Sequence, residues 1–166
     1  QSRSSAASDV YKRQAWGQLA FLVFSFACLA HTFLTDDFSV AYVAQNSNSR
    51  LPWYYKLSAI WAAHEGSLLL WVLIQACWTF AVSIGARQLP AAMLARVLAV
   101  MGMISSGFLL FLIDTSNPFI RLLPNVPIDG RDLNPLLQDI GLIVHPPILY
   151  ICLLYTSDAA DDLLCV

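Results

Sequence analysis

Charged side chains are scarce in this chain of 166 residues. Only 12% of the residues are Asp, Glu, Lys or Arg, whereas soluble domains carry about 25%. The nine basic and eleven acidic residues leave a net charge of −2, which favours neither nucleic acid nor a strongly acidic ligand as a partner. With 58% hydrophobic residues and a mean hydropathy of +0.62, the composition predicts a membrane protein rather than a soluble domain.

Cysteines are also few, and their spacing carries no signal for a redox or metal site. Of the four cysteines, Cys152 and Cys165 lie near the C-terminus, while Cys28 and Cys77 lie in separate apolar segments, and no C-x-x-C pair occurs. Neither a disulfide framework nor a dithiol redox pair is therefore predicted. Cys28 and Cys77 are expected to be small, buried packing residues.

The two ends of the chain are related through their coding sequences. Back-translation of Ser4–Gln14 gives a DNA whose reverse complement, read in a shifted frame, encodes Cys152–Asp162. Unrelated protein segments should not be antisense copies, and the DNA resembles a transposase sequencing adapter. We therefore interpret residues 1–14 and 152–166 as adapter-derived and not native. Residues 15–151 are then a fragment of a membrane domain, and the basic pair before the first apolar run is not the start of a signal peptide.

Three apolar segments are long enough to cross a membrane, since a spanning helix needs about 20 largely apolar residues. They are residues 15–34, 57–84 and 93–113, and a fourth begins at Ile143 and is cut short. The predicted fold class is all-α, a polytopic helical membrane fragment with three full transmembrane helices, a truncated fourth and two periplasmic loops. The isolated polar residues Gln18 and Gln75 are expected to form hydrogen bonds between helices.

The distribution of charge in the loops predicts the orientation in the membrane. The short link 85–92 carries Arg87 and no acidic residue, whereas the two longer loops carry both signs. Because basic residues in short loops stay inside, the short link should be cytoplasmic and the longer loops periplasmic. In those loops, the aromatic group 53–55 should anchor the second span at headgroup level. A short helix should start near Pro135, with Leu136 and Leu137 against the bundle.

Polar and aromatic residues recur at intervals of three and four along the second span, which places them on one helix face. They are Trp61, His64, Leu68, Trp71, Gln75 and Trp78. Together with Glu65, the residues Trp61, His64 and Trp71 form the candidate wall of a cofactor pocket. The alternative is helix packing, with the aromatic rings in the core and His64 bonded to a neighbouring carbonyl. His31, alone near the end of its span, is assigned an interfacial or packing role.

His145 is the most informative single residue, because Pro146 and Pro147 follow it directly. Proline suits the first turn of a helix. His145 is therefore predicted at the start of the fourth helix, held at the outer membrane surface with its ring toward water. A neutral imidazole in such a place is a candidate axial ligand for haem iron. The alternative is a histidine that merely caps the helix.

Five segments, in order along residues 15–151, carry a resemblance to a known family. Their sequences are DFSVAYVA (37–44), WAAHEGSLLLW (61–71), TSNPF (115–119), GRDLNPLLQD (130–139) and LIVHPPILY (142–150). They resemble the CcmF family of cytochrome c maturation proteins, haem-handling proteins with a tryptophan-rich WWD segment. Ile140 departs from the family, which usually has proline at that position.

The resemblance implies a subunit of the haem lyase in the bacterial inner membrane. Such a subunit receives b-type haem, its substrate, from a periplasmic haem chaperone and positions it for thioether attachment to apocytochrome c. The implied partners are these two proteins, other cytochrome c maturation membrane subunits and membrane lipid. His145 matches one of two periplasmic histidines that ligate the incoming haem iron. The second such histidine, the tryptophan-rich segment, the family's first helix and the ligands of a resident haem are absent, so the fragment alone should be inactive.

Two other functions stay open at this point. A proton- or ion-translocating subunit would use Glu65 and His64, since ionisable groups inside a membrane are expensive and mark function. A purely structural membrane partner would use neither residue. Within the resembled family, a paralogue that serves a nitrite reductase cytochrome shares the same motifs.

Overall fold

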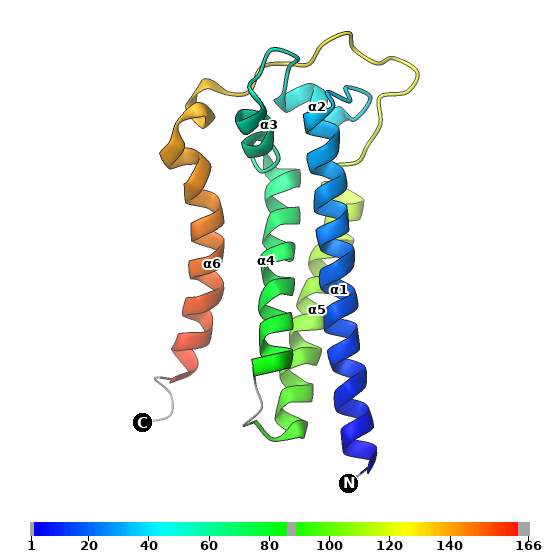
Figure 1. The fold of residues 1–166 in the computed structure, drawn as a ribbon, viewed down its shortest axis with the longest axis vertical. Coiled ribbons are helices and arrows are strands. Elements are labelled where there is room, and N and C mark those ends of the chain that lie inside the picture. Colours follow the sequence, from blue (N-terminus) through cyan, green and yellow to red (C-terminus); the bar gives the residue numbers. More distant parts are fainter. Residues whose placement is uncertain (1, 86–88, 163–166) are drawn as a thin grey trace.

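The structure is a computed structural model that describes residues 2–85 and 89–162 (Figure 1). Within these ranges its regular structure is all helical, as predicted: the backbone forms six α-helices and one 3-10 helix, and strand-like pairing is limited to one isolated bridge between Val40 and Arg121. Arg87, on which the predicted orientation depends, lies outside the described residues.

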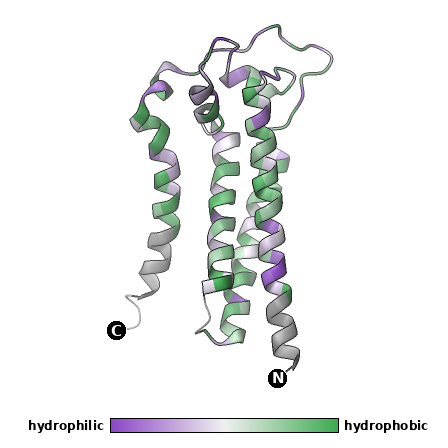
Figure 2. Cartoon of the chain, in the orientation of Figure 1, coloured by the Kyte–Doolittle hydropathy of each residue, from purple (hydrophilic) through white to green (hydrophobic). Residues whose placement is uncertain are grey.

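Three long apolar helices form the body of the molecule. They are α1 (Ser2–Leu34), α4 (His64–Gly85) and α5 (Ala91–Thr115), which lie side by side with α4 in contact with the other two. Each is long and apolar enough to cross a membrane, which confirms the three predicted spans (Figure 2). A fourth long helix, α6 (Ile140–Asp162), packs against α4 (Figure 1).

The second span is shorter than predicted, because segment 57–84 is broken in two. A short helix, α3 (Trp53–Ala59), ends before a turn at residues 60–63, and α4 starts after it. The break is held by Tyr42 of α2 (Ala41–Asn46). The Tyr42 hydroxyl donates to the Ile60 carbonyl over 2.9 Å and accepts from the Ala63 amide over 3.2 Å. A buried side chain thus satisfies backbone groups that a continuous helix would have paired internally.

A chain of hydrogen bonds inside the bundle confirms the predicted roles of Gln18 and Gln75. Gln18 of α1 donates to the Ser105 hydroxyl of α5 over 2.7 Å. That hydroxyl donates to Oε1 of Gln75 in α4 over 2.7 Å, and Gln75 donates in turn to the Met101 carbonyl. Three spans are therefore joined by polar groups that have partners, as expected where no water can replace them.

Cys77 is exposed, so the expectation that both cysteines are buried is wrong for this one, while Cys28 is half-buried. The buried residues of α4 recur on one side of the helix, among them Leu69, Val72 and Ala76. Cys77 follows Ala76 by one residue, about 100° around the helix, and therefore lies outside the buried face of α4. Its face is available to lipid or to other helices.

The two longer loops meet at one end of the bundle and form a cap over it (Figure 1). Amide hydrogen bonds join them directly, from Leu122 to the Ser39 carbonyl and from Arg131 to the Ala44 carbonyl, both over 2.7 Å. The short helix predicted near Pro135 is present as the 3-10 helix η1 (Pro135–Gln138). Of its two leucines, Leu137 packs on the core as expected, whereas Leu136 is 70% exposed, contrary to prediction.

Candidate functional site

The helix that carries His145 begins earlier than the prolines suggest. Oδ1 of Asp139 accepts hydrogen bonds from the amides of Gly141 and Leu142, over 2.8 and 3.3 Å. These bonds satisfy amides of the first turn, which have no partner inside the helix, and α6 starts at Ile140. The prediction that the prolines occupy the first turn is therefore wrong. His145 is the sixth residue of α6, and both prolines lie inside the helix.

A tryptophan on the α3–α4 turn compensates for one of these internal prolines. In a regular helix the amide of residue 147 would donate to the carbonyl of residue 143, but Pro147 has no N–H. Nε1 of Trp61 donates to the Ile143 carbonyl instead, over 2.9 Å. Two turns further on, the Tyr150 hydroxyl donates to the Ser67 hydroxyl of α4 over 3.2 Å. These two bonds attach α6 to the capped end of α4.

His145 lies on the other side of α6. It follows Ile143 by two residues, so it lies about 200° around the helix from the residue that meets Trp61. Its side chain is exposed, and no hydrogen bond joins its ring to another of the residues that the structure describes. The imidazole nitrogens are thus presented to the surroundings of α6, and the ring makes no capping bond.

The four residues predicted to form a pocket wall are distributed over separate contacts. Trp71 packs against Phe108 of α5 with ring centroids 4.3 Å apart, which is helix packing. His64, the first residue of α4, is exposed, and its Nδ1 lies 3.0 Å from the Ser116 hydroxyl. Glu65 beside it is half-buried. The Trp61 indole donates its hydrogen bond to the Ile143 carbonyl of α6. Among the described residues, no group of three or more His, Cys, Asp or Glu side chains could hold a metal ion.

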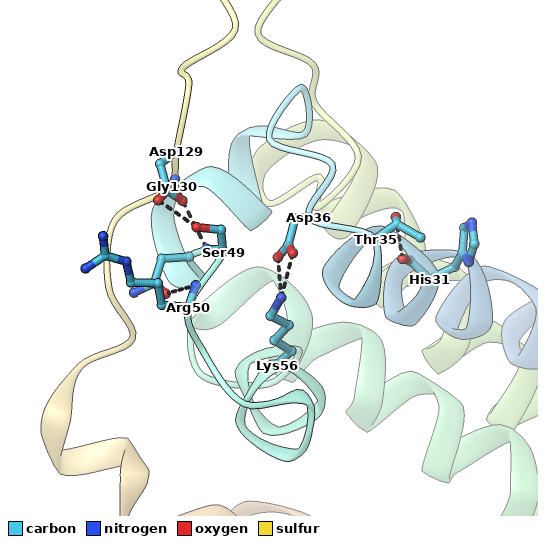
Figure 3. Close-up of polar contacts among 9 residues, drawn as sticks. His31, Thr35, Asp36, Ser49, Arg50, Lys56, Asp129 and Gly130 are labelled. Atoms are coloured by element: carbon cyan, nitrogen blue, oxygen red, sulfur yellow. Dashed lines mark hydrogen bonds and ion pairs between the residues drawn. The ribbon is translucent and has the colours of Figure 1, made fainter.

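Two carboxylates in the cap are held by donors, one of them from the opposite loop (Figure 3). Asp129 accepts from the amide and the hydroxyl of Ser49, over 3.0 and 2.9 Å, and from the Gly130 amide. These bonds favour the carboxylate and lower the pKa of Asp129. Lys56 of α3, whose side chain is 9% exposed, bonds both carboxylate oxygens of Asp36 over 2.6 Å. The cap is therefore a docked structure rather than a pair of free loops.

The Asp129 contact gives the cap a pH dependence. Its pKa is lowered from an ordinary value of 3.8, so its contribution is complete above that value and is lost as the pH falls through the lowered pKa. We expect an acid protease to cleave the loop 116–139 increasingly as the pH falls below 3.8. In Asp129→Asn, cleavage at the higher pH should already be raised and should change less with pH. Equal profiles for the two proteins would show that this carboxylate does not hold the loop.

His31 lies at the last turn of α1, beside the cap, and its side chain is exposed. Its carbonyl accepts from the Thr35 hydroxyl over 2.8 Å (Figure 3). This position is consistent with the interfacial role expected for it.

Several residues that build the site were missed by the sequence reasoning. Tyr42, Ser67 and Tyr150 act through single hydroxyl groups whose partners are distant in sequence, and a hydroxyl has no spacing signature. Asp139 carried a signal, because Asp before an apolar run is a common helix cap. The two prolines after His145 predicted a later helix start, and the cap signal of Asp139 was not used.

Comparison with known proteins places the chain among membrane proteins of cytochrome assembly. The model of the family described as "Cytochrome C assembly protein" matches residues 61–160. The cytochrome c-type biogenesis protein CcmF of Pseudomonas aeruginosa is 78% identical over 136 residues, which are 82% of this chain and 21% of that protein. The Escherichia coli CcmF is 56% identical over 149 residues, 90% of this chain and 23% of the relative.

The probable cytochrome c-type biogenesis protein NrfE of Escherichia coli is less similar, at 48% identity over 134 residues, 81% of this chain and 24% of that protein. The chain thus spans about a fifth to a quarter of the length of these relatives. No solved structure matches it.

Proposed function

This chain belongs to the cytochrome c assembly protein family, and from that premise we propose that it is a segment of a haem lyase subunit. The whole subunit receives b-type haem from a periplasmic haem chaperone and holds it for thioether attachment to apocytochrome c, together with other maturation subunits in the membrane. In this proposal haem is the substrate, and the segment supplies one axial ligand, His145. Haem and the cysteine thiols provide the reactive groups, and the protein provides orientation.

The observation that carries the proposal is the placement of His145. A haem iron already has four porphyrin nitrogens and takes one side chain on each face, so a single well-placed imidazole is sufficient from one segment. His145 is exposed on a helix whose rotation is held by two hydrogen bonds, one from Trp61 in the α3–α4 turn and one to Ser67 of α4. An axial ligand must be held in a fixed orientation toward the iron, and the helix supplies this orientation.

Identity to relatives from one organism favours the general maturation protein over its paralogue. The chain is 56% identical to CcmF and 48% identical to NrfE of Escherichia coli. We therefore propose a CcmF-type role rather than a role dedicated to a nitrite reductase cytochrome.

We propose that the cap is periplasmic and that the membrane is the bacterial inner membrane. The α4–α5 link then faces the cytoplasm, and His145, at the capped end, faces the periplasm. In a protein without native cysteines, Leu89→Cys should react with an impermeant maleimide only in inside-out vesicles, while Ile128→Cys in the cap should react in intact spheroplasts. The reverse pattern would place His145 in the cytoplasm and exclude the proposed haem source.

The function is tested by exchange of this segment into a complete relative. Residues 15–151, the part that we propose to be native, would replace the matching segment of Pseudomonas aeruginosa CcmF, which is 78% identical. In a strain that lacks its own CcmF, the chimera should restore c-type cytochromes, measured by haem staining of membrane proteins. Failure of a chimera that accumulates normally in the membrane would contradict the proposal.

The ion-translocating alternative depends on Glu65 and His64 and predicts a different result. Both residues lie at the capped end of α4, and His64 is exposed there, whereas a proton path needs groups across the membrane. Glu65→Gln in the chimera should leave cytochrome c yield within about twofold of the parent, since it changes a charge away from the proposed ligand. Loss of cytochromes with normal accumulation would favour the alternative.

A further inference from the structure

We infer that Trp61 is a positioning residue for His145. Its indole N–H replaces the hydrogen bond that Pro147 cannot donate to the Ile143 carbonyl, and this bond fixes the rotation of α6 that directs His145 away from α4. The inference rests on the proposed role of His145 as a haem ligand.

The bond from Trp61 reaches a carbonyl that a proline leaves without its helical donor. Pro146 and Pro147 remove the donors that a regular helix would offer to the carbonyls of residues 142 and 143. Trp61 donates to the second of these, over 2.9 Å. A carbonyl without a donor in an apolar setting is costly, so the indole N–H is expected to stay bonded to it.

A second hydrogen bond sets the rotation of α6. Tyr150 follows Ile143 by seven residues, which returns it to nearly the same side of the helix. Its hydroxyl donates to the Ser67 hydroxyl, and the Ser67 hydroxyl donates to the Trp61 carbonyl over 3.0 Å. Trp61 thus meets α6 directly through its side chain and indirectly through its carbonyl. Two attachments on one side of α6 leave His145 on the opposite side.

Trp61 is itself held in place, as a positioning residue must be. It lies in the turn between α3 and α4, next to Ile60, whose carbonyl accepts the bond from buried Tyr42. Burial raises the pKa of Tyr42, so its hydroxyl keeps the proton that it donates. The backbone beside Trp61 is therefore anchored, its side chain packs against the core, and the position of α6 follows from that of the cap.

The test restores the missing donor by mutation. In the chimera, Trp61→Phe keeps a ring and removes the N–H. Adding Pro147→Ala returns a main-chain N–H to the helix at the Ile143 carbonyl, so the indole should become dispensable. Pro146→Ala is the matched control, because it returns an N–H that serves the Leu142 carbonyl instead and should not rescue.

The readout is the orientation of α6 and needs no bound haem. In a background without native cysteines, His145→Cys and Ile143→Cys are made separately, and their rates of labelling by a small maleimide are compared. Residue 145 should react much faster than residue 143 in the parent. Trp61→Phe should reduce this ratio about fivefold, the effect expected of one hydrogen bond. Pro147→Ala should restore it to within about twofold, whereas Pro146→Ala should not.

Three results would overturn the inference: an unchanged ratio in Trp61→Phe, equal rescue by both alanine variants, or no rescue by either. If Trp61→Phe does not accumulate in the membrane, accumulation of the two double variants becomes the test. Adding Pro147→Ala should restore accumulation and adding Pro146→Ala should not. Equal recovery with both, or recovery with neither, would overturn the inference.

The failure of this inference is separate from that of the proposed function. The expected labelling pattern, in a protein whose cytochrome yield does not depend on His145, would retain the positioning of α6 and reject the haem-ligand role. If instead His145→Ala loses cytochromes and Trp61→Phe leaves the labelling ratio unchanged, the haem-ligand role is retained and the positioning by Trp61 is rejected.

Discussion

His145→Ala in the full-length chimera should reduce c-type cytochromes at least about tenfold, because even groups that only support a metal ligand change function by 10- to 100-fold. The helix should remain, since Asp139 caps its start and the hydrogen bonds of Ile143 with Trp61 and of Tyr150 with Ser67 do not involve His145. The chimera should therefore accumulate normally in the membrane. The measurement is haem-stained cytochrome relative to chimera protein in the same membranes.

Two controls separate loss of a ligand from loss of structure. His31→Ala alters another exposed histidine near the cap and should leave the yield within about twofold of the parent. Imidazole added to cells that carry His145→Ala should restore part of the yield, because a free ligand can occupy the vacant position on the iron. A fully active His145→Ala protein would leave this residue without a role in haem handling.

Gly66→Ala should prevent stable folding of the cap. A Cβ at this position would overlap the Ile60 carbonyl oxygen and lie 2.6 Å from the Tyr42 hydroxyl, the two groups that form the hydrogen bond across the α3–α4 break. The overlap involves backbone, which cannot move away cheaply, so we expect a loss of about 3 kcal/mol or more in the free energy of unfolding. The measurements are accumulation in the membrane and the midpoint of thermal unfolding in detergent, followed by tryptophan fluorescence.

Gly107→Ala is the matched control for this variant. Gly107 also lies in a spanning helix, but a Cβ there meets nothing within 4 Å. Alanine in a helix interior is favoured over glycine by about 0.5–1 kcal/mol, so this variant should be as stable as the parent or slightly more so. Equal thermal midpoints for Gly66→Ala and the parent would show that the Tyr42 contact is not as close as the structure places it.

Features that depend on long stretches of residues could be predicted from the sequence. The spans follow from hydrophobic length, and the two longer loops meet at one end because three spans alternate in direction. Gln18 and Gln75 were predicted to bond between helices because a lone polar group in a membrane must find a partner. The short helix after Asn134 was predicted from Pro135, and Asn134 does accept from the Leu136 amide at its start.

Features that depend on one distant atom could not be predicted in this way. The break at residues 60–63 lies inside a continuous apolar run, and only the hydroxyl of Tyr42 reveals it. The helix after Asp139 starts before the prolines because a carboxylate caps it, and the cost of internal prolines is offset by an indole some 80 residues away in sequence. The spacing of Trp61, His64 and Trp71 placed them on one helix face, but Trp61 lies in the turn before that helix and contacts α6.

The most direct test of the central claim is the absorption and magnetic circular dichroism spectrum of haem captured by the purified chimera. His145→Cys replaces an imidazole with a sulfur ligand at the same position on α6. If His145 binds the iron, the spectrum of the captured haem should change from that of nitrogen ligation to that of thiolate ligation, or to a form that has lost one axial ligand. The same spectrum for the parent and His145→Cys, at equal haem content, would contradict the assignment of His145 as an axial ligand.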